Sequence, residues 1–407
     1  MPAAAYDALP YTDHAYAESH PDRLAVVARL SGWAPPALET ARVLELGCGR
    51  GGNLLPMASS LPGATLVGID ASHRQIAEAR RVASEAGVAN VTFHAETFEQ
   101  APAAVTPGGH DFVLCHGVYS WVPISTRRAL LALIARALSP GGIAYVSFNT
   151  LPGWYERLAA RDWLRFSGDP DAGASLAWLT RHVSPSAELH TYRQSLDAVA
   201  RRLRETDRAY AVHEYLAREH HPETVTAFLG EAEAAGLSYL GDAIPGHTAL
   251  ELLPEPVAER ARSLDVIGAQ QLVDYVRGAS FRRALLVRAP GTGAWQAPRS
   301  LQPSALESLR IASRLRSDGP VTTAGPELFT SEGGAVHVTD PATRHALRAL
   351  ARVAPRSLRY ADLVDLVSAS AGPSPDRREA LAAERVVKDR PIARSRRGGG
   401  DITPRPR

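Results

Sequence analysis

Residues 42–148 alternate short apolar segments with amphipathic ones, and this alternation limits the fold more than any other feature. Helical patterns separate the apolar segments, among them SHRQIAEARRVASEAG (72–87), which Ser72 should cap and Gly87 should end. A second is TRRALLALIARALSPGG (126–142), which Pro140-Gly141-Gly142 should end. Strands separated by helices predict an α/β fold with a parallel, doubly wound sheet. The predicted strands are RVLEL (42–46), TLVGID (65–70), VTFHA (91–95), DFVLC (111–115) and IAYVSF (143–148).

Two later apolar segments, GLSYLGDA (236–243) and FRRALLV (281–287), also resemble strands. We expect them to complete a seven-stranded sheet as an antiparallel hairpin, with helical insertions between residues 155 and 235. A linker rich in Pro, Gly and Ser follows at 288–305. After it, ELFTSEGGAVHVTD (327–340) predicts a hairpin and residues 341–355 and 359–368 predict two helices. These elements suggest a small winged-helix-like module.

Composition narrows the classes of function. The 407 residues contain no apolar run of about 18, the length that a membrane span needs, and the N-terminus has no export signal. Two cysteines, Cys48 and Cys115, are too few for a disulfide framework, which favours a cytoplasmic location, and no zinc site or other metal site is expected. Residues 385–407 hold eight basic and two acidic residues, whereas the whole chain has a net charge of +2. The rest of the chain is therefore mildly acidic, which argues against nucleic acid as the main partner.

The loop LELGCGRGGN (44–53) follows the first predicted strand and opens a helix, and its glycines at 47, 49 and 52 satisfy the pattern G-x-G-x-x-G. This pattern serves both nicotinamide dinucleotides and S-adenosylmethionine (SAM). Glu45 decides between them, because an acid before the first glycine suits the methionine ammonium and would repel a pyrophosphate. Asp70 ends the second strand and can accept both ribose hydroxyls, while Glu96 follows the third strand and is placed to meet the adenine amino group. The residues therefore predict SAM as the cofactor.

The segment HGVYSWVP (116–123) follows the fourth predicted strand, where a simple turn would hold Gly, Asn, Asp or Pro. We assign His116 and Gly117 to the cofactor, and Tyr119 and Trp121 to a channel for the methyl acceptor. The alternative is that these two aromatic residues only pack a loop onto the domain. Trp154, which follows the fifth strand in NTLPGW, is predicted to form the opposite wall.

At this point the sequence resembles the class I SAM-dependent methyltransferases, and more narrowly the bacterial ones that carry a methyltransferase regulatory domain. The resemblance rests on RVLELGCGRGGNLLPMA, on GID with Gln75 after it, on HGVYSWVP and on AYVSFNTLPGWYERLAARDW. It continues through HEYLAREHHPETVTAFLGEAEAAGLSYLGDA (213–243) and QQLVDYVRGASFRRALL (270–286), and covers about residues 6–290. The best-known members are rickettsial protein lysine methyltransferases that act on outer-membrane proteins.

The resemblance implies that the N-terminal segment folds over the cofactor, with Tyr11, His20 and Arg23 as its polar residues of interest. For His20 and Arg23 the other reading is a helix cap in HPDRL. The implied regions are a cofactor-covering segment (1–40), a SAM-binding core (41–165), a regulatory helical region (166–290), the winged-helix-like module (291–370) and a disordered basic tail (371–407).

Residues and resemblance together give two sets of candidates. His213 and Glu214, in the HEYL segment, are candidates for receiving or relaying a proton, although both also suit the surface of a helix. With the three aromatic residues, the catalytic set is Tyr119, Trp121, Trp154, His213 and Glu214. The cofactor set is Tyr11, Glu45, Gly47, Cys48, Gly49, Asn53, Asp70, Ala71, Gln75, Glu96, Thr97, His116 and Gly117.

The most favoured function is methylation of a protein lysine, because an aromatic, water-poor channel favours the neutral amine over the ammonium. A small-molecule N- or O-methyltransferase would use the same core. A non-catalytic SAM-binding regulatory protein would explain the basic tail and the winged-helix-like module. A nicotinamide-dependent oxidoreductase is the weakest alternative, because Glu45 opposes it.

Overall fold

The computed structural model describes residue 7 and residues 13–100, 105–169, 171–206, 208–288, 303–317 and 325–371. Tyr11, most of the linker predicted at 288–305 and the tail predicted after residue 371 lie outside these residues. The chain divides into two compact units, one of residues 1–250 and 255–300 and one of residues 251–254 and 301–407.

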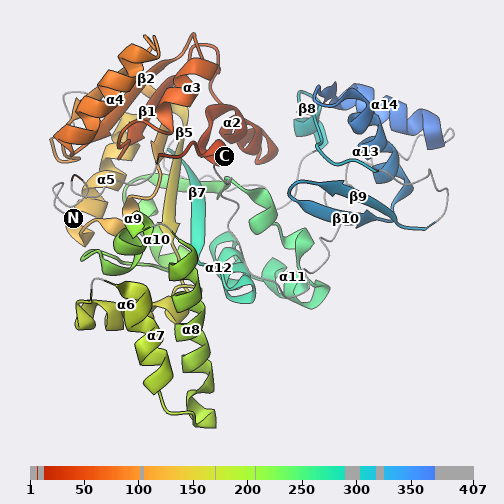
Figure 1. Cartoon of the computed structure of the whole chain (residues 1–407). Helices are drawn as coiled ribbons and strands as arrows, with labels where there is room; N and C mark the ends of the chain where they lie inside the picture. Colours follow the sequence, from red (N-terminus) through yellow and green to blue (C-terminus); the bar gives the residue numbers. More distant parts are fainter. Residues whose placement is uncertain are drawn as a thin grey trace. The chain divides into compact units, whose positions relative to one another are not determined.

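A seven-stranded sheet organises the first unit (Figure 1), and its strand order is β3-β2-β1-β4-β5-β7-β6. The first five strands in the sequence pair in parallel, whereas β7 lies antiparallel between β5 and β6. The predicted seven-stranded sheet with an antiparallel hairpin is therefore confirmed. Its strands are β1 (Arg42–Leu46), β2 (Thr65–Asp70), β3 (Val91–Ala95), β4 (His110–Cys115), β5 (Leu138–Asn149), β6 (Leu237–Asp242) and β7 (Phe281–Arg288).

Helices cover both faces of this sheet, because alternate residues of each buried strand point to opposite sides. Val43 and Phe112 face the helices α2 (Pro21–Leu30), α3 (Leu54–Ser60) and α4 (His73–Glu85). Leu44 and Val113 face α5 (Ile124–Ala137) and α10 (Val225–Ala234). Each face thus has a hydrophobic core of its own, and the edge where the parallel strands end stays free for other side chains.

Local sequence signals determine where most of the helices and strands begin or end. Ser72 caps α4 by accepting a hydrogen bond from the Gln75 N–H at 3.0 Å, as its sequence predicts. The predicted end of the helix at 126–142 is wrong, because α5 ends at Ala137 and β5 already begins at Leu138. Leu138 is fully buried and pairs with His110 of β4, so burial of its side chain in the sheet overrides helix continuation.

Between β5 and β6 the chain forms a helical insertion, which is yellow-green in Figure 1. Its own core includes Leu164, Leu176, Leu196 and Tyr215. The elements are α6 (Tyr155–Ser167), α7 (Ala172–His182), η4 (Ala187–Leu189), α8 (His190–Glu205), α9 (Arg208–Ala211) and η5 (Val212–Leu216). After β6 the chain adds η6 (Pro245–His247), η7 (Leu250–Leu252), α11 (Glu255–Arg262) and α12 (Val266–Arg277).

The second unit contains the predicted hairpin and both predicted helices, with a small core that includes Leu350 and Val367. The two strands of the hairpin pair antiparallel. Its identification as a winged-helix module stays a prediction. The elements are η8 (Pro303–Leu306), β8 (Arg310–Ile311), β9 (Glu327–Ser331), β10 (Gly334–Val338), α13 (Pro341–Val353), β11 (Leu358–Arg359) and α14 (Tyr360–Ala371). Among the residues that the structure describes, none of the helices has the length and apolar character of a membrane span.

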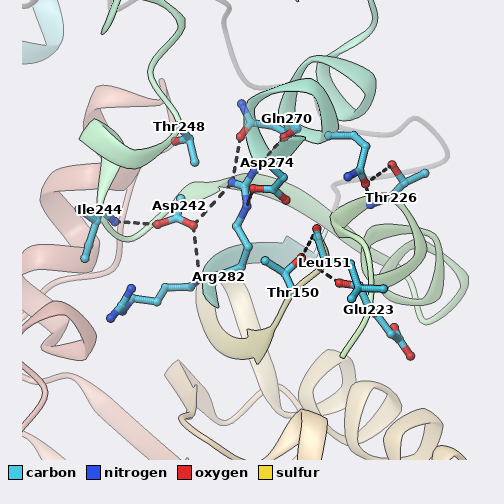
Figure 2. Close-up of polar contacts among 12 residues, drawn as sticks. Thr150, Leu151, Glu223, Thr226, Asp242, Ile244, Thr248, Gln270, Asp274 and Arg282 are labelled. Carbon is cyan, nitrogen blue, oxygen red and sulfur yellow. Dashed lines mark hydrogen bonds and ion pairs between the residues drawn. The ribbon is translucent and has the colours of Figure 1, made fainter. Parts of the chain in front are cut away.

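A buried guanidinium ties α12 to the hairpin β6–β7 (Figure 2). Arg282 of β7 donates from Nε to Asp274 Oδ1 at 2.9 Å, from Nη1 to Gln270 Oε1 at 3.0 Å and from Nη2 to the Gln270 carbonyl at 2.9 Å. Asp242 of β6 lies 3.7 Å from Nη1 and accepts a hydrogen bond from the Ile244 N–H. All three charged side chains are almost completely buried. Each of these charges therefore needs its partners to offset the cost of burying it.

Removal of one partner from this cluster tests its contribution. We expect Asp274→Ala to lower the free energy of unfolding by about 3–5 kcal/mol, because the Arg282 charge stays buried without its main partner. The matched control is Glu78→Ala, which breaks an exposed pair with Arg81 and should change stability little. Urea unfolding of the full chain measures both. Equal urea midpoints of unfolding for the two variants would contradict the stabilising role of the buried cluster.

Candidate functional site

The loop between β1 and α3 turns sharply at glycines whose backbone takes positive φ angles, +79° at Gly47 and +54° at Gly49. A Cβ added to Gly47 would lie 2.3 Å from Cγ2 of Val118. The N–H groups of Gly47 and Cys48 both donate to the Ile69 carbonyl, at 2.8 and 3.1 Å. The loop backbone therefore packs between the end of β2 and the segment after β4.

Glu45 is buried beneath this loop. Its Oε1 accepts a hydrogen bond from Asn53 Nδ2 at 2.7 Å, whereas its Oε2 is buried and finds no partner within the described ranges of the chain. Burial raises the pKa of the Glu45 carboxyl to about 7, the Asn53 hydrogen bond lowers it and Asp70 raises it further. A carboxyl group in this state gains strongly from a cationic partner.

Asp70 and Glu96 continue this acidic edge at the ends of β2 and β3. Asp70 accepts hydrogen bonds from the Gly49 N–H at 3.0 Å and the Ser72 N–H at 2.9 Å, and burial raises its pKa. The Glu96 N–H donates to the Asp70 carbonyl at 3.0 Å, and Glu96 Oε2 is buried with no partner among the described residues. Two carboxylate oxygens, one on Glu45 and one on Glu96, are thus unsatisfied at one edge of the sheet.

The remaining predicted cofactor residues surround this edge. Gln75 is buried, and its Oε1 lies 3.1 Å from where a Cβ on Gly49 would stand. Ala71 is exposed beside Asp70. Thr97 donates a hydrogen bond to Gln100 at 3.3 Å.

The N-terminal segment lies directly on the loop. The Tyr16 N–H donates to Asn53 Oδ1 at 2.9 Å, and the Tyr16 ring stacks on His116 with 3.6 Å between centroids. His20 caps α2 by accepting from the Asp22 N–H, which agrees with the helix-cap reading. Asn53 therefore links Glu45 and the N-terminal segment through one amide group.

His116 and Gly117 follow β4 at the same edge. His116 Nδ1 lies 2.8 Å from the Tyr145 hydroxyl, and burial, with Arg283 nearby, lowers its pKa to about 3. Gly117 has a φ of +66°, and its N–H donates to Ser147 Oγ at 2.8 Å. The imidazole is therefore neutral, and a ligand at the loop meets it beside the Tyr16 ring.

Tyr119 lies in the hydrophobic core and has no exposed surface. Its ring meets Phe228 edge to face at 5.0 Å, and its hydroxyl donates to Glu231 Oε2 at 2.6 Å. The Arg127 guanidinium covers the ring at 4.5 Å. These contacts correct the prediction that Tyr119 lines a channel and agree with the alternative that it packs its loop onto the domain.

Trp121 and Trp154 lie together beyond the ends of β4 and β5, with His220 between them. The ring centroids of His220 are 4.5 Å from Trp121 and 4.2 Å from Trp154. Tyr215 lies 6.4 Å from Trp154. The structure therefore brings the two predicted tryptophans into one buried cluster, together with two residues from the later helical region.

His213 and Glu214 lie in η5, a single π-helical turn, and both are buried. The surface alternative is wrong for both. Burial raises the pKa of Glu214 to about 7, while nearby Arg157 lowers it. A carboxyl group with this pKa can accept and release a proton near neutral pH.

Two protein families match the chain, one described as a methyltransferase domain over residues 43–142 and one as a predicted methyltransferase regulatory domain over residues 207–288. The uncharacterized protein RP028 of Rickettsia prowazekii is 33% identical over 218 residues, which cover 52% of this chain and 86% of that protein. The chain belongs to the class I SAM-dependent methyltransferases that carry a methyltransferase regulatory domain.

Two further proteins are similar to this methyltransferase over a larger part of its chain. PKMT2 from Rickettsia typhi, solved in complex with AdoHcy, superposes with a TM-score of 0.78 at 26% identity, over 92% of this chain and 74% of PKMT2. The uncharacterized protein RP789 of Rickettsia prowazekii is 34% identical over 290 residues, which cover 69% of this chain and 52% of RP789. The chain thus spans about half the length of RP789.

The acidic edge fits SAM, which is the cofactor of this methyltransferase family. SAM carries a sulfonium and an ammonium group, and the buried, partnerless oxygen of Glu45 is a matching acceptor. The unsatisfied Glu96 oxygen suits a donor such as an adenine amino group. These side chains would hold the cofactor, which supplies an electrophilic methyl group when bound.

Sequence reasoning missed several residues of this edge, above all Tyr16, Tyr215 and His220. The only signal for His220 is its place in a His-His-Pro sequence after the HEYL segment, and nothing local shows that its ring is buried. Tyr16 lies within the N-terminal resemblance, but its stacking on His116 depends on contacts far apart in the sequence.

The raised pKa of Glu45 predicts a pH-dependent affinity for SAM. Below about pH 7 the carboxyl is protonated and must lose its proton before it pairs with an ammonium. The Kd for SAM should therefore rise by up to about tenfold for each pH unit below 7. Calorimetric titrations between pH 5.5 and 7.5 measure this.

The control for this prediction is Glu45→Gln, which keeps the size of the side chain and removes the titrating group. We expect it to bind SAM about 10- to 100-fold more weakly at pH 7.5 and to lose the Glu45 part of the pH dependence. A variant with the same pH profile as the wild type would show that another group titrates.

Proposed function

We propose that this methyltransferase transfers a methyl group from SAM to lysine side chains of a protein. The observation that carries the proposal is the likeness to PKMT2, a rickettsial protein lysine methyltransferase, which extends over 92% of the chain and includes the regulatory region. By contrast, the trans-aconitate 2-methyltransferase of Methylobacterium nodulans matches only 35% of this chain. A match over so small a part of the chain does not identify a small-molecule acceptor.

The chemistry of lysine methylation agrees with the buried cluster after β4 and β5. A lysine ammonium has a free pKa of about 10.4 and must lose its proton before its lone pair can attack a methyl group. The aromatic surroundings of Trp121 and Trp154 disfavour the charged form. Glu214, with a pKa of about 7, is suited to take up the proton. Positioning and exclusion of water supply the remaining catalysis.

The other assignments belong to the same proposal. The cofactor set predicted from the sequence holds SAM, and residues 13–19 cover it as part of the N-terminal segment. His213 assists Glu214 in relaying the proton. We also propose the five regions predicted from the sequence and a cytoplasmic place of action. Both described cysteines, Cys48 and Cys115, are free thiols, which suits a reducing compartment.

Labelling identifies the acceptor. The purified chain is incubated with SAM carrying a deuterated methyl group and an extract of the source organism, and protein digests and metabolites are examined by mass spectrometry. We expect deuterated methyl groups on lysine side chains. The control is Asp70→Asn, which weakens the contacts at the ribose position and should lower the incorporation at least tenfold at limiting SAM.

Each other outcome rejects the proposal in a different way. Label confined to metabolites would identify a small-molecule methyltransferase. Tight SAM binding without label on any molecule would identify a non-catalytic SAM-binding protein.

A further inference from the structure

A short segment of the regulatory region is fixed onto the end of β5. The Glu223 N–H donates to the Asn149 carbonyl at 3.1 Å, and the Leu151 N–H donates to the Glu223 carbonyl at 3.0 Å. Thr150 Oγ1 donates to the same carbonyl at 2.8 Å. Figure 2 shows Glu223 beside Thr150 and Leu151. Residues 220–223 therefore extend the strand edge at the site.

The Arg127 side chain of α5 and a backbone carbonyl of η3 (Tyr119–Trp121) hold this segment from the other side. Arg127, which is fully buried, pairs with the Glu223 carboxylate and donates to the His221 carbonyl at 2.5 Å. The His221 N–H donates to the Ser120 carbonyl at 2.9 Å. These bonds fix the position of His220 between Trp121 and Trp154.

The orientation of His220 leaves one ring nitrogen without a partner. Asn149 Nδ2 lies 3.0 Å from His220 Nε2, so Nε2 accepts and Nδ1 carries the proton of the neutral ring. Burial, with Arg161 nearby, lowers the pKa of His220 to about 3, which keeps the ring neutral. His220 Nδ1 is buried and has no hydrogen-bond partner among the residues that the structure describes.

Two further buried polar atoms of the same cluster, Trp154 Nε1 and the Tyr215 hydroxyl, also lack hydrogen-bond partners in the described part of the chain. Trp154 is fully buried, and its indole N–H can only donate. Buried donors that find no acceptor cost free energy in every folded molecule. Three of them within one cluster indicate a ligand that presents acceptor oxygens.

The charges around the cluster define the ligand further. The Arg157 guanidinium lies 5.1 Å from the Trp154 ring and that of Arg161 lies 5.9 Å from the Trp121 ring. Arg161 is almost completely buried, and its two hydrogen bonds go to main-chain carbonyls. Within the described part of the chain, neither arginine has a carboxylate within ion-pair distance. Glu214 lies near both guanidinium groups, which lower its pKa, but burial raises that pKa to about 7. A carboxyl group that is only partly ionised near neutral pH balances the two cations incompletely, so the cluster favours a further anion.

We propose that Trp154, His220, Arg157 and their neighbours bind a carboxylate of the methyl acceptor, namely an acidic side chain close in sequence to the acceptor lysine. This inference rests on the proposed function and adds a specificity to it. The cofactor does not supply the carboxylate, because its edge after β1, β2 and β3 is acidic, whereas the guanidinium groups of Arg157 and Arg161 lie at the cluster after β4 and β5. Arg157 is half-buried, so its side chain is accessible from solvent.

Direct binding tests the site without any methylation. Glutarate, a dicarboxylate, is titrated into ¹⁵N-labelled protein saturated with S-adenosylhomocysteine, and the indole N–H resonances of the six tryptophans are followed. The Trp154 resonance is assigned by its absence in Trp154→Phe. We expect it to shift with saturation on adding glutarate and to stay in place with glutaramide, the neutral analogue. Equal responses to both compounds, or no response, would overturn the inference.

A pair of arginine variants tests the role of charge. Arg157→Gln should weaken glutarate binding at least tenfold. Arg165→Gln removes the same charge from an exposed position on the same helix and should leave binding unchanged. If both variants weaken binding alike, the effect is general attraction and the site is wrong.

Peptide substrates connect the site to specificity. Acetylated heptapeptides with a central lysine carry one glutamate or one glutamine at each other position in turn. At the best position the wild type should prefer glutamate by about 10- to 100-fold in kcat/KM, and Arg157→Gln and Trp154→Phe should reduce this preference toward unity. Calorimetry with SAM alone should give the same Kd for Arg157→Gln and the wild type.

The outcomes separate the two proposals. Lysine methylation that ignores acidic neighbours overturns the inference and leaves the proposed function intact. A loss of SAM affinity in Arg157→Gln would mean that the carboxylate belongs to the cofactor, which also overturns it. If glutarate moves Trp154 but no lysine is ever methylated, the proposed function fails while the carboxylate site itself stands.

Discussion

The parallel pairing of the first five strands determines where everything else in the site can lie. Parallel strands bring their carboxyl ends to one edge, so residues that are far apart in the sequence meet there without any long loop. Glu45, Asp70, Glu96, His116 and Asn149 all stand at or just beyond such an end. The two faces of the sheet pack into two separate hydrophobic cores, and polar side chains gather at its edge.

The two halves of this edge carry different charged groups. After β1, β2 and β3 it carries three carboxyl groups, and burial raises the pKa of two of them, Glu45 and Asp70. Beyond β4 and β5 it carries two guanidinium groups beside neutral aromatic and imidazole rings, together with Glu214, whose pKa burial raises to about 7. A cationic cofactor and an anionic feature of an acceptor would each find the opposite charge, and the reacting groups would meet between the two halves.

The sequence predicted the sheet, the hairpin that completes it and the class of cofactor, because these depend on local patterns. Strand segments such as TLVGID, the cap at Ser72 and the acids after the strands are all visible within a few residues. Side-chain environments were harder to predict. Tyr119 and Trp121 are neighbours in one short motif, yet Tyr119 packs into the core and Trp121 joins the cluster with His220. The direction of each ring is set by α10 and by residues 220–223, about a hundred positions later, which no local pattern contains.

The same long-range dependence appears at β5. Leu138 begins this strand although the preceding residues are strongly helical, because a partner strand and a buried side chain outweigh local preference. His220 is the clearest case, since a polar His-His-Pro stretch looks like exposed loop. Its burial follows from its own hydrogen bond with Asn149 and from the bonds of the next residue, His221, with Ser120 and Arg127, and these are properties of the folded chain.

The place of β7 has a consequence for how such proteins can be divided. Seven residues of β5 pair with β7, and β7 belongs to the regulatory region. A fragment cut before that region would expose β5 as a bare, apolar edge strand, which is a template for aggregation. The two regions therefore form one folding unit, and neither is a detachable module that could be exchanged between proteins on its own.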